Sequence, residues 1–350
     1  MNKITSVKFK GHESFVLRRG WIYKGLKAVA ENVKGTEFDL TKKQDQTNFD
    51  LLLGESNKQT QDVFLSNDIT VILGLGSNMC KSLRYYLRAC GLTEERRCAT
   101  GKKCTVLTEF GQFVLEHDPN LRFPETIALV HLKLALNAEL ATAWYLFFSE
   151  MDSNEISAKE LVTTAHSFLY EQGLTQVSER SIEDDFSCLS SMYAGSVYNG
   201  SLNNINGKDD NSLSFDPENL LESPFVSLKL LRYGVASNIV VKVPLKAQLL
   251  SYYFWAGIFL QSFVGAKEIP LEELYIPVGS VGRALNLGRA EVLRIADELD
   301  RKGLVRTIRT SGLDVIQLPN NEVITKEHIE TLLLKCYKQK STREFSKHEY

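Results

Sequence analysis

The sequence predicts a mainly α-helical α+β protein, with two winged helix-turn-helix units around a helical middle region. Apolar residues recur at helical spacing through much of the chain, and short alternating segments are confined to a few places. Two compact segments also share one order of elements. The 350 residues, 43% of them hydrophobic, supply enough apolar material for about two domains.

We divide the chain into four regions. Residues 1–120 form an N-terminal winged-helix-like region, and residues 121–245 form the helical middle region with an acidic, loop-rich segment. Residues 246–330 form a C-terminal winged-helix unit, and residues 331–350 form a basic tail.

The C-terminal unit has a helix whose apolar residues lie on one stripe, and Gly303 is placed to end it. Its predicted order is two short helices, a turn, this longer helix and two strands, at residues 271–274, 278–285, 286–288, 289–302, 304–308 and 314–318. This is the winged-helix order, in which the longest helix enters a major groove of DNA.

The N-terminal unit follows the same plan. A strand is predicted at 69–73, a Gly-rich turn at 74–78 and a helix at 79–90, and another helix opens at 107–111. Three cations share the polar face of the 79–90 helix, and a basic loop follows it. The polar residues predicted to contact DNA in this unit are Ser77, Asn78, Lys81, Arg84, Arg88, Arg96, Arg97, Lys102 and Lys103.

The remaining expected elements are mostly helical. They are a helix at 21–33, a polar loop at 32–60, a buried helical pattern at 126–151, helices at 157–170 and 181–193, a mobile loop at 195–216, a hairpin at 225–243 and a buried helix at 249–265.

The net charge of −2 hides a strong segregation of charge. Residues 1–30 carry +6, residues 74–110 carry +4, and residues 282–312 and 332–350 carry +3 each. Residues 149–223 carry −11. Basic patches are typical of phosphate binding, although solvated helix faces give the same pattern.

Two basic helix-turn-helix units favour double-stranded DNA as the partner, and a packing or dimerisation module is the alternative. In the C-terminal unit the predicted DNA contacts are Arg289, Arg294, Arg306 and Arg309. The N-terminus has no apolar signal segment and the longest apolar stretch is too polar to span a membrane. The six cysteines show no disulfide framework, so we expect a cytoplasmic protein.

Four stretches resemble a bacterial domain-of-unknown-function family whose studied members are called SspB. The most specific is FKGHESFVLRRGW at residues 9–21, and the others lie at residues 73–86, 107–111 and 141–148. The resemblance covers the chain through about residue 330. It implies a role in DNA phosphorothioation and the phage defence built on it, in which SspB-like proteins nick one DNA strand. It also implies a cysteine desulfurase, an ATPase and a sulfurtransferase as partners.

Nicking needs a nucleophile, stabilisation of developing negative charge and usually a divalent metal. The best local cluster is His12 as base or ligand, Glu13 as the ligand of Mg²⁺ or Mn²⁺, and Arg18 and Arg19 as the phosphate clamp. In the alternative interpretation Glu13 pairs with one of these arginines and His12 caps a turn. A second carboxylate cluster, at residues 183–185, more simply complements the dipole of a helix start.

The leading hypothesis is a metal-dependent DNA-nicking enzyme. A non-catalytic subunit that recognises DNA and recruits the sulfur-insertion enzymes is the main alternative, with the acidic middle region as a docking surface. A transcription regulator of the same operon is the third. The bases recognised, the metal and the oligomeric state stay open, and a homodimer is compatible with the sequence.

Overall fold

The computed structural model describes residues 4–33, 62–97, 103–195, 222–235, 238–310 and 313–345. The loops predicted at 32–60 and 195–216 fall almost entirely outside these residues, as does Lys102. Helices dominate the described part and three small antiparallel sheets accompany them, so the α+β class is confirmed. Within the same part, no helix is long and apolar enough to cross a membrane.

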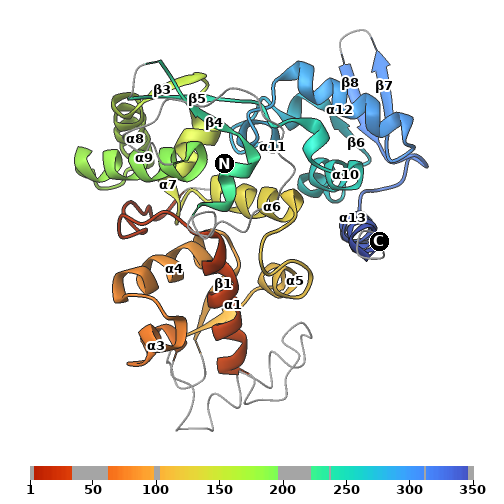
Figure 1. Cartoon of the computed structure of the whole chain (residues 1–350). Coiled ribbons are helices and arrows are strands. Elements are labelled where there is room, and N and C mark those ends of the chain that lie inside the picture. Colours follow the sequence, from red (N-terminus) through yellow and green to blue (C-terminus); the bar gives the residue numbers. More distant parts are fainter. Residues whose placement is uncertain are drawn as a thin grey trace.

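The N-terminal unit lies below the rest of the molecule in Figure 1. Helix α1 packs against helices α3 and α4 and against the hairpin of β1 and β2. The bounds are α1 Arg19–Val33, α3 Ile69–Leu73, α4 Ser77–Ala89, β1 Thr93–Arg97, β2 Lys103–Leu107 and α5 Glu109–His117.

Two predictions in this unit were wrong. The β-branched segment expected as a strand at 69–73 is the short helix α3, which ends at Gly74 in the left-handed conformation. It buries Leu73 against the core and leaves Val71 80% exposed. The segment expected as a loop around Arg96 is strand β1, paired antiparallel with β2. In both cases packing against neighbouring elements overrides local propensity.

Helix α5 approaches the chain after α4 closely at Gly111. A Cβ atom there would lie 1.9 Å from the carbonyl oxygen of Leu92, so the backbone would have to move. We expect Gly111→Ala to lower the free energy of unfolding by about 2 kcal/mol. Gly20→Ala in α1 is the matched control. Among the described residues nothing lies within 4 Å of the added Cβ, and helix propensity favours alanine. Urea denaturation measures the free energy of unfolding of both variants, and equal values would contradict the close approach at Gly111.

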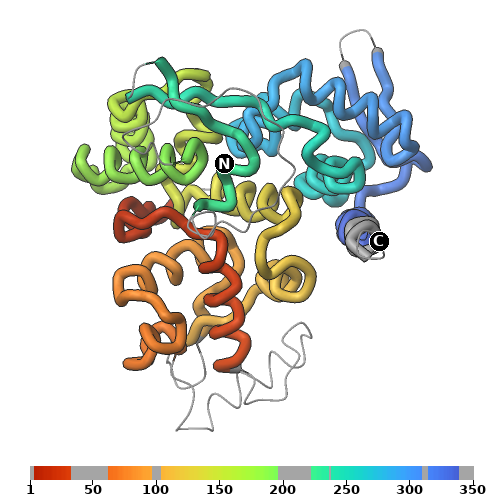
Figure 2. Tube along the Cα trace, viewed as in Figure 1, coloured from red at the N-terminus to blue at the C-terminus, as the bar shows by residue number. Residues whose placement is uncertain are grey.

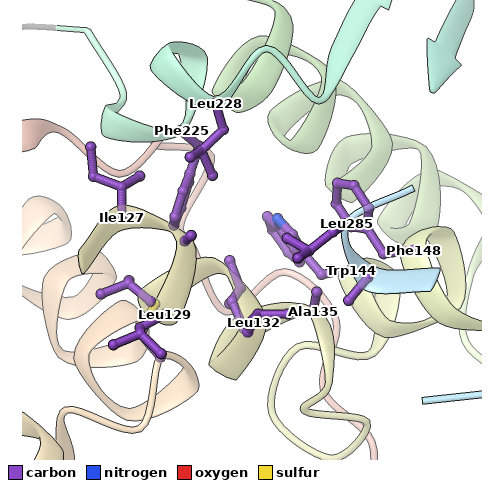
Figure 3. Close-up of a cluster of buried hydrophobic side chains, with 14 of the residues drawn as sticks. Ile127, Leu129, Leu132, Ala135, Trp144, Phe148, Phe225, Leu228 and Leu285 are labelled. Atoms are coloured by element: carbon purple, nitrogen blue, oxygen red, sulfur yellow. The ribbon is translucent and has the colours of Figure 1, made fainter. Parts of the chain in front are cut away.

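The middle region contains α6 Pro124–Ala135, α7 Thr142–Tyr145, α8 Ala158–Gln172, α9 Glu179–Ala194 and a sheet in the order β3-β5-β4 (Glu155–Ser157, Ile239–Lys242, Leu231–Tyr233). Between residues 136 and 141 the helical pattern expected at 126–151 is interrupted. There the Asn137 side chain donates to the carbonyl of Ala89 and accepts from the Leu140 N–H. Figure 3 shows a part of the core beside α6, with Ile127 and Phe225 on one side and Trp144 and Phe148 on the other.

The C-terminal unit follows the predicted order. A three-stranded antiparallel sheet in the order β6-β8-β7 accompanies the helices, and α12 ends before Gly303 at φ 67°. The bounds are α10 Tyr252–Leu260, β6 Glu268–Pro270, α11 Val281–Ala284, α12 Arg289–Arg301, β7 Arg306–Thr310, β8 Leu313–Gln317 and α13 Lys326–Phe345, and a 3-10 turn spans Leu271–Leu274. Helix α13 packs on α10, as the tube in Figure 2 also shows.

A buried histidine joins the middle region to the C-terminal unit. His131 of α6 donates from Nε2 to the carbonyl of Ala284 (2.7 Å), so Nδ1 accepts from the Tyr193 hydroxyl (2.6 Å). Burial holds the imidazole neutral and lowers the pKa of His131 to about 4.

This histidine predicts a loss of stability in acid. Its folded pKa lies below the unfolded value of 6.5, so its contribution is complete above pH 6.5 and is lost as the pH falls toward 4. Between pH 7 and pH 4.5 the expected loss is about 2.5 kcal/mol. Urea denaturation at pH 7 and pH 4.5 measures it, and His131→Gln should reduce the difference between the two. An unchanged difference in that variant would contradict the assignment.

Candidate functional site

The GHES motif, residues 11–14, and Lys10 before it form a turn between the N-terminal unit and the middle region, the GHES turn. His12 is fully buried within it, and Glu13 is exposed. Three non-glycine residues of this turn adopt left-handed backbone angles: Lys10 (φ 55°), Glu13 (49°) and Ser14 (65°). Each costs about 1 kcal/mol, so surrounding contacts must hold the turn.

Those contacts come from helix α9. The Nε2 atom of His12 lies 2.7 Å from Oδ1 of Asp185, which is itself buried. The same oxygen accepts from the backbone N–H of Lys10 at 2.9 Å. The ammonium of Lys10 pairs with Asp184 at 2.6 Å on the surface. The structure thus brings together two clusters that the sequence separates by more than 170 residues.

The hydrogen bonds of His12 fix its protonation. The N–H of Ser14 donates to Nδ1 at 3.0 Å, so the single proton of the ring lies on Nε2 and points at Asp185. Burial has the largest single effect and opposes charge on the imidazole, but the interactions of the ring with Asp185 and Cys188 together outweigh it and raise the pKa of His12. A second proton, at Nδ1, would have to displace the Ser14 N–H.

The residue after this turn is anchored on both sides. The carbonyl of Phe15 accepts from the hydroxyl of Tyr86 in α4 (2.8 Å) and from the thiol of Cys188 in α9 (3.5 Å). The His12 and Trp144 rings meet edge to face, with centroids 6.0 Å apart. The turn is therefore held by three helices: α4, α7 and α9.

Arg18 and Arg19, the other predicted catalytic residues, follow the GHES turn in sequence but contact residues outside it. Arg18 stacks over the ring of Trp21 at 5.5 Å, and Arg19 donates to the carbonyl of Leu121 at 2.7 Å. Within the described residues, neither contact supports the pairing of Glu13 with an arginine that the alternative interpretation expects. Both ring nitrogens of His12 are bonded inside the protein, which leaves no nitrogen for a scissile phosphate in this conformation.

The predicted cationic face of α4 is largely neutralised within the protein. Arg84 donates to the buried carboxylate of Asp62 at 2.8 Å and also lies 3.3 Å from Glu95 in β1. Arg88 pairs with the same Glu95 at 2.8 Å. Only the N-terminal part of this face is exposed, at Ser77, Asn78 and Lys81.

The cations of the hairpin are only partly described. Arg96 pairs with Glu94 at 2.6 Å. The side chains of Arg97 and Lys103 lie outside the described part, although both residues belong to the paired strands. An open pocket of about 480 Å³ adjoins the hairpin, lined by Arg88, Gly91, Thr93, Glu94, Glu95, Thr108 and Leu140.

The C-terminal unit presents more accessible cations. Arg294 of α12 and Arg306 of β7 are exposed. Arg289 begins α12 and lies 3.9 Å from Asp314, while Arg309 pairs with Asp297. These four residues all belong to the C-terminal unit and lie far in sequence from the GHES turn.

Two buried carboxylates were not predicted in their observed roles: Asp185, which contacts His12, and Asp62, which pairs with Arg84. Asp185 was assigned to a helix start, and its contact with His12 has no local signal. Asp62 lies in a polar stretch with no motif around it. In the described part of the chain, no group of three His, Cys, Asp or Glu side chains is arranged to hold a metal ion.

Comparison with known proteins places the chain among proteins of one family. A family model described as a protein of unknown function, DUF4007, matches residues 9–335. The chain therefore belongs to the DUF4007 family. No curated protein matches it.

Two crystal structures of SspB share its fold, one of them magnesium ion-bound. Each has 20% sequence identity, a TM-score of 0.72, and coverage of 96% of this chain and 89% of the SspB chain. The predicted resemblance is confirmed at the level of family and fold.

Proposed function

We propose that this protein binds double-stranded DNA and nicks one strand with Mg²⁺ or Mn²⁺, as a cytoplasmic component of a bacterial DNA phosphorothioation and phage-defence system. The shared fold with SspB supports this choice of system, which is the one that the sequence resemblance to SspB implies. In this proposal the N-terminal region (residues 1–120) and the C-terminal unit (residues 246–330) contact DNA, and the middle region lies between them in the sequence.

The observation that carries DNA binding is the C-terminal unit. Its strand, helical turn, two helices and two further strands follow the winged-helix order, and the sheet order β6-β8-β7 supports this assignment. Helix α12 would occupy the major groove, with Arg289 and Arg294 toward bases and phosphates. Arg306 would reach a phosphate from the wing. The N-terminal unit, with α3, α4 and the β1–β2 hairpin, would make a second, weaker contact.

The proposed nicking site is the GHES turn. Glu13 is an exposed carboxylate, and Mg²⁺ is typically held by one or two carboxylates together with substrate phosphates and water. A metal ion there would stabilise charge that develops on the scissile phosphate. The magnesium ion-bound SspB structure supports the choice of metal. Arg18 and Arg19 would contact the phosphate only after leaving Trp21 and Leu121.

DNA binding predicts a measurable salt dependence. Replacing Arg289, Arg294 and Arg306 with alanine should weaken binding to a 25-base-pair duplex at least tenfold and flatten the dependence of log Kd on log salt by roughly 0.9 per lost phosphate contact. Arg232→Ala, which removes an exposed arginine from the middle region, is the control. An unchanged slope in the triple variant would remove this unit from the DNA interface.

One observation favours the non-catalytic alternative. The ring of His12 is fully buried and both its nitrogens are bonded, which suits an anchor of the fold better than a base. In that case the protein would recognise DNA and recruit the cysteine desulfurase, ATPase and sulfurtransferase. Incubation of supercoiled plasmid with each metal separates the two proposals. Gel shifts without conversion to open circle would favour recruitment.

A further inference from the structure

The GHES turn has a conformation that its own sequence disfavours. Glu13 and Ser14 follow one another in the left-handed region, and Lys10 lies in the same region three residues earlier. None of them is a glycine, so contacts within the fold must hold this conformation. Glu13 is exposed, and its backbone conformation sets the direction in which its side chain leaves the turn.

Two backbone hydrogen bonds close the turn, from Glu13 N–H to the Lys10 carbonyl (3.4 Å) and from Phe15 N–H to the His12 carbonyl (2.8 Å), and the His12 side chain adds contacts on both sides of it. Its Nδ1 atom accepts the N–H of Ser14, directly after Glu13. Its Nε2 atom donates to Asp185, and the same carboxylate oxygen binds the N–H of Lys10. One buried ring thus fixes the C-terminal side of the turn directly and connects it, through Asp185, to the N-terminal side.

We propose that His12 is a positioning residue that holds Glu13 in its left-handed conformation and so aims the Glu13 carboxylate at the metal ion and the scissile phosphate. The inference rests on the proposed nicking function. His12 acts through Glu13 and does not touch DNA, because its ring is fully buried. Its essential contact is the one from Ser14 N–H to Nδ1.

Two substitutions separate the contacts of the ring. In asparagine, Oδ1 stands at the branch position of Nδ1 and keeps an acceptor for Ser14, but nothing reaches Asp185. In glutamine, Nε2 stands at the position of the histidine Nε2 and keeps a donor for Asp185, but the acceptor for Ser14 is lost. A residue that merely anchors the fold should depend on the deeper contact with Asp185, and a positioning residue should depend on the contact with Ser14.

The experiment compares nicking of supercoiled plasmid by the wild-type protein, His12→Asn and His12→Gln over a range of Mn²⁺ concentrations, with a melting curve for each. We expect His12→Gln to nick at least tenfold more slowly and to need at least tenfold more Mn²⁺ for half-maximal rate. His12→Asn should stay within threefold of the wild type in both. If His12→Asn does not fold, the double variant His12→Asn/Asp185→Asn, which also removes the unpaired charge, takes its place.

Cleavage by trypsin after Lys10 supplies a readout that does not need nicking. It should be at least tenfold faster in His12→Gln than in His12→Asn, because only the latter keeps the turn closed. Equal nicking and equal trypsin sensitivity in the two variants, or a larger loss in His12→Asn, would overturn the positioning role. A wild-type protein that does not nick at all would instead count against the proposed function, and the trypsin comparison would still decide the role of His12 in the turn.

Discussion

Glu13→Gln should lower the rate of plasmid nicking by at least about 100-fold, which corresponds to about 2.7 kcal/mol of transition-state stabilisation. The amide keeps the size of the side chain but removes the negative charge that would hold the metal ion. Because Glu13 is exposed, the melting temperature and the affinity for duplex DNA should not change. Nicking, gel shift and thermal melting on the same preparations measure the three quantities.

Glu109→Gln is the matched control for this prediction. Glu109 is also exposed and belongs to the same unit, but it lies at the start of α5, outside the GHES turn. It should nick at the wild-type rate. Full activity in Glu13→Gln would retire the proposed metal ligand and leave the nicking site to be sought elsewhere in the chain.

Arg84→Ala should lower the free energy of unfolding by about 2 to 3 kcal/mol. The carboxylate of Asp62 is fully buried and accepts from Arg84 (2.8 Å), from the Thr105 hydroxyl (2.9 Å) and from the Phe64 N–H (3.0 Å). Removing the guanidinium leaves that charge without its cation. The effect falls short of the full cost of an unpaired buried charge because two donors remain and Arg84 is partly exposed to solvent.

Lys81→Ala on the same helix is the control, because Lys81 is exposed and makes only a 3.3 Å contact with Asn78. Its stability should stay within about 0.5 kcal/mol of the wild type. If Lys81 binds a phosphate, the salt slope of DNA binding should fall by roughly 0.9. Equal unfolding free energies for the two variants, measured by urea denaturation, would contradict the assignment of Arg84 to the Asp62 network.

The sequence predicted the helices and strands of the C-terminal unit well because their signals are local. The apolar stripe of α12 and the glycine at 303 define the helix within one segment, and β7 and β8 follow within a few residues. Helix α3 was predicted as a strand because Ile, Thr and Val favour strands in isolation. Its helical form depends on packing against α1 and α4, which a window of five residues does not contain.

The candidate site was predicted only in part for the same reason. The GHES motif drew attention to His12 and Glu13, but the partner that buries His12 lies 173 residues away on α9. Helical spacing correctly placed Lys81, Arg84 and Arg88 on one helix. It could not show that Asp62 pairs with Arg84 and that Glu95 of β1 pairs with Arg88. A basic residue can contribute its charge to DNA binding only where the fold does not pair it with a carboxylate.

The most direct test of nicking is the conversion of supercoiled plasmid to open circle by the purified full-length chain, with Mg²⁺, with Mn²⁺ and with excess chelator. We expect open circle with at least one metal and none with chelator. Plasmid that stays supercoiled with both metals, while the protein still shifts the same DNA in a gel, would contradict nicking and leave a DNA-recognition subunit in its place.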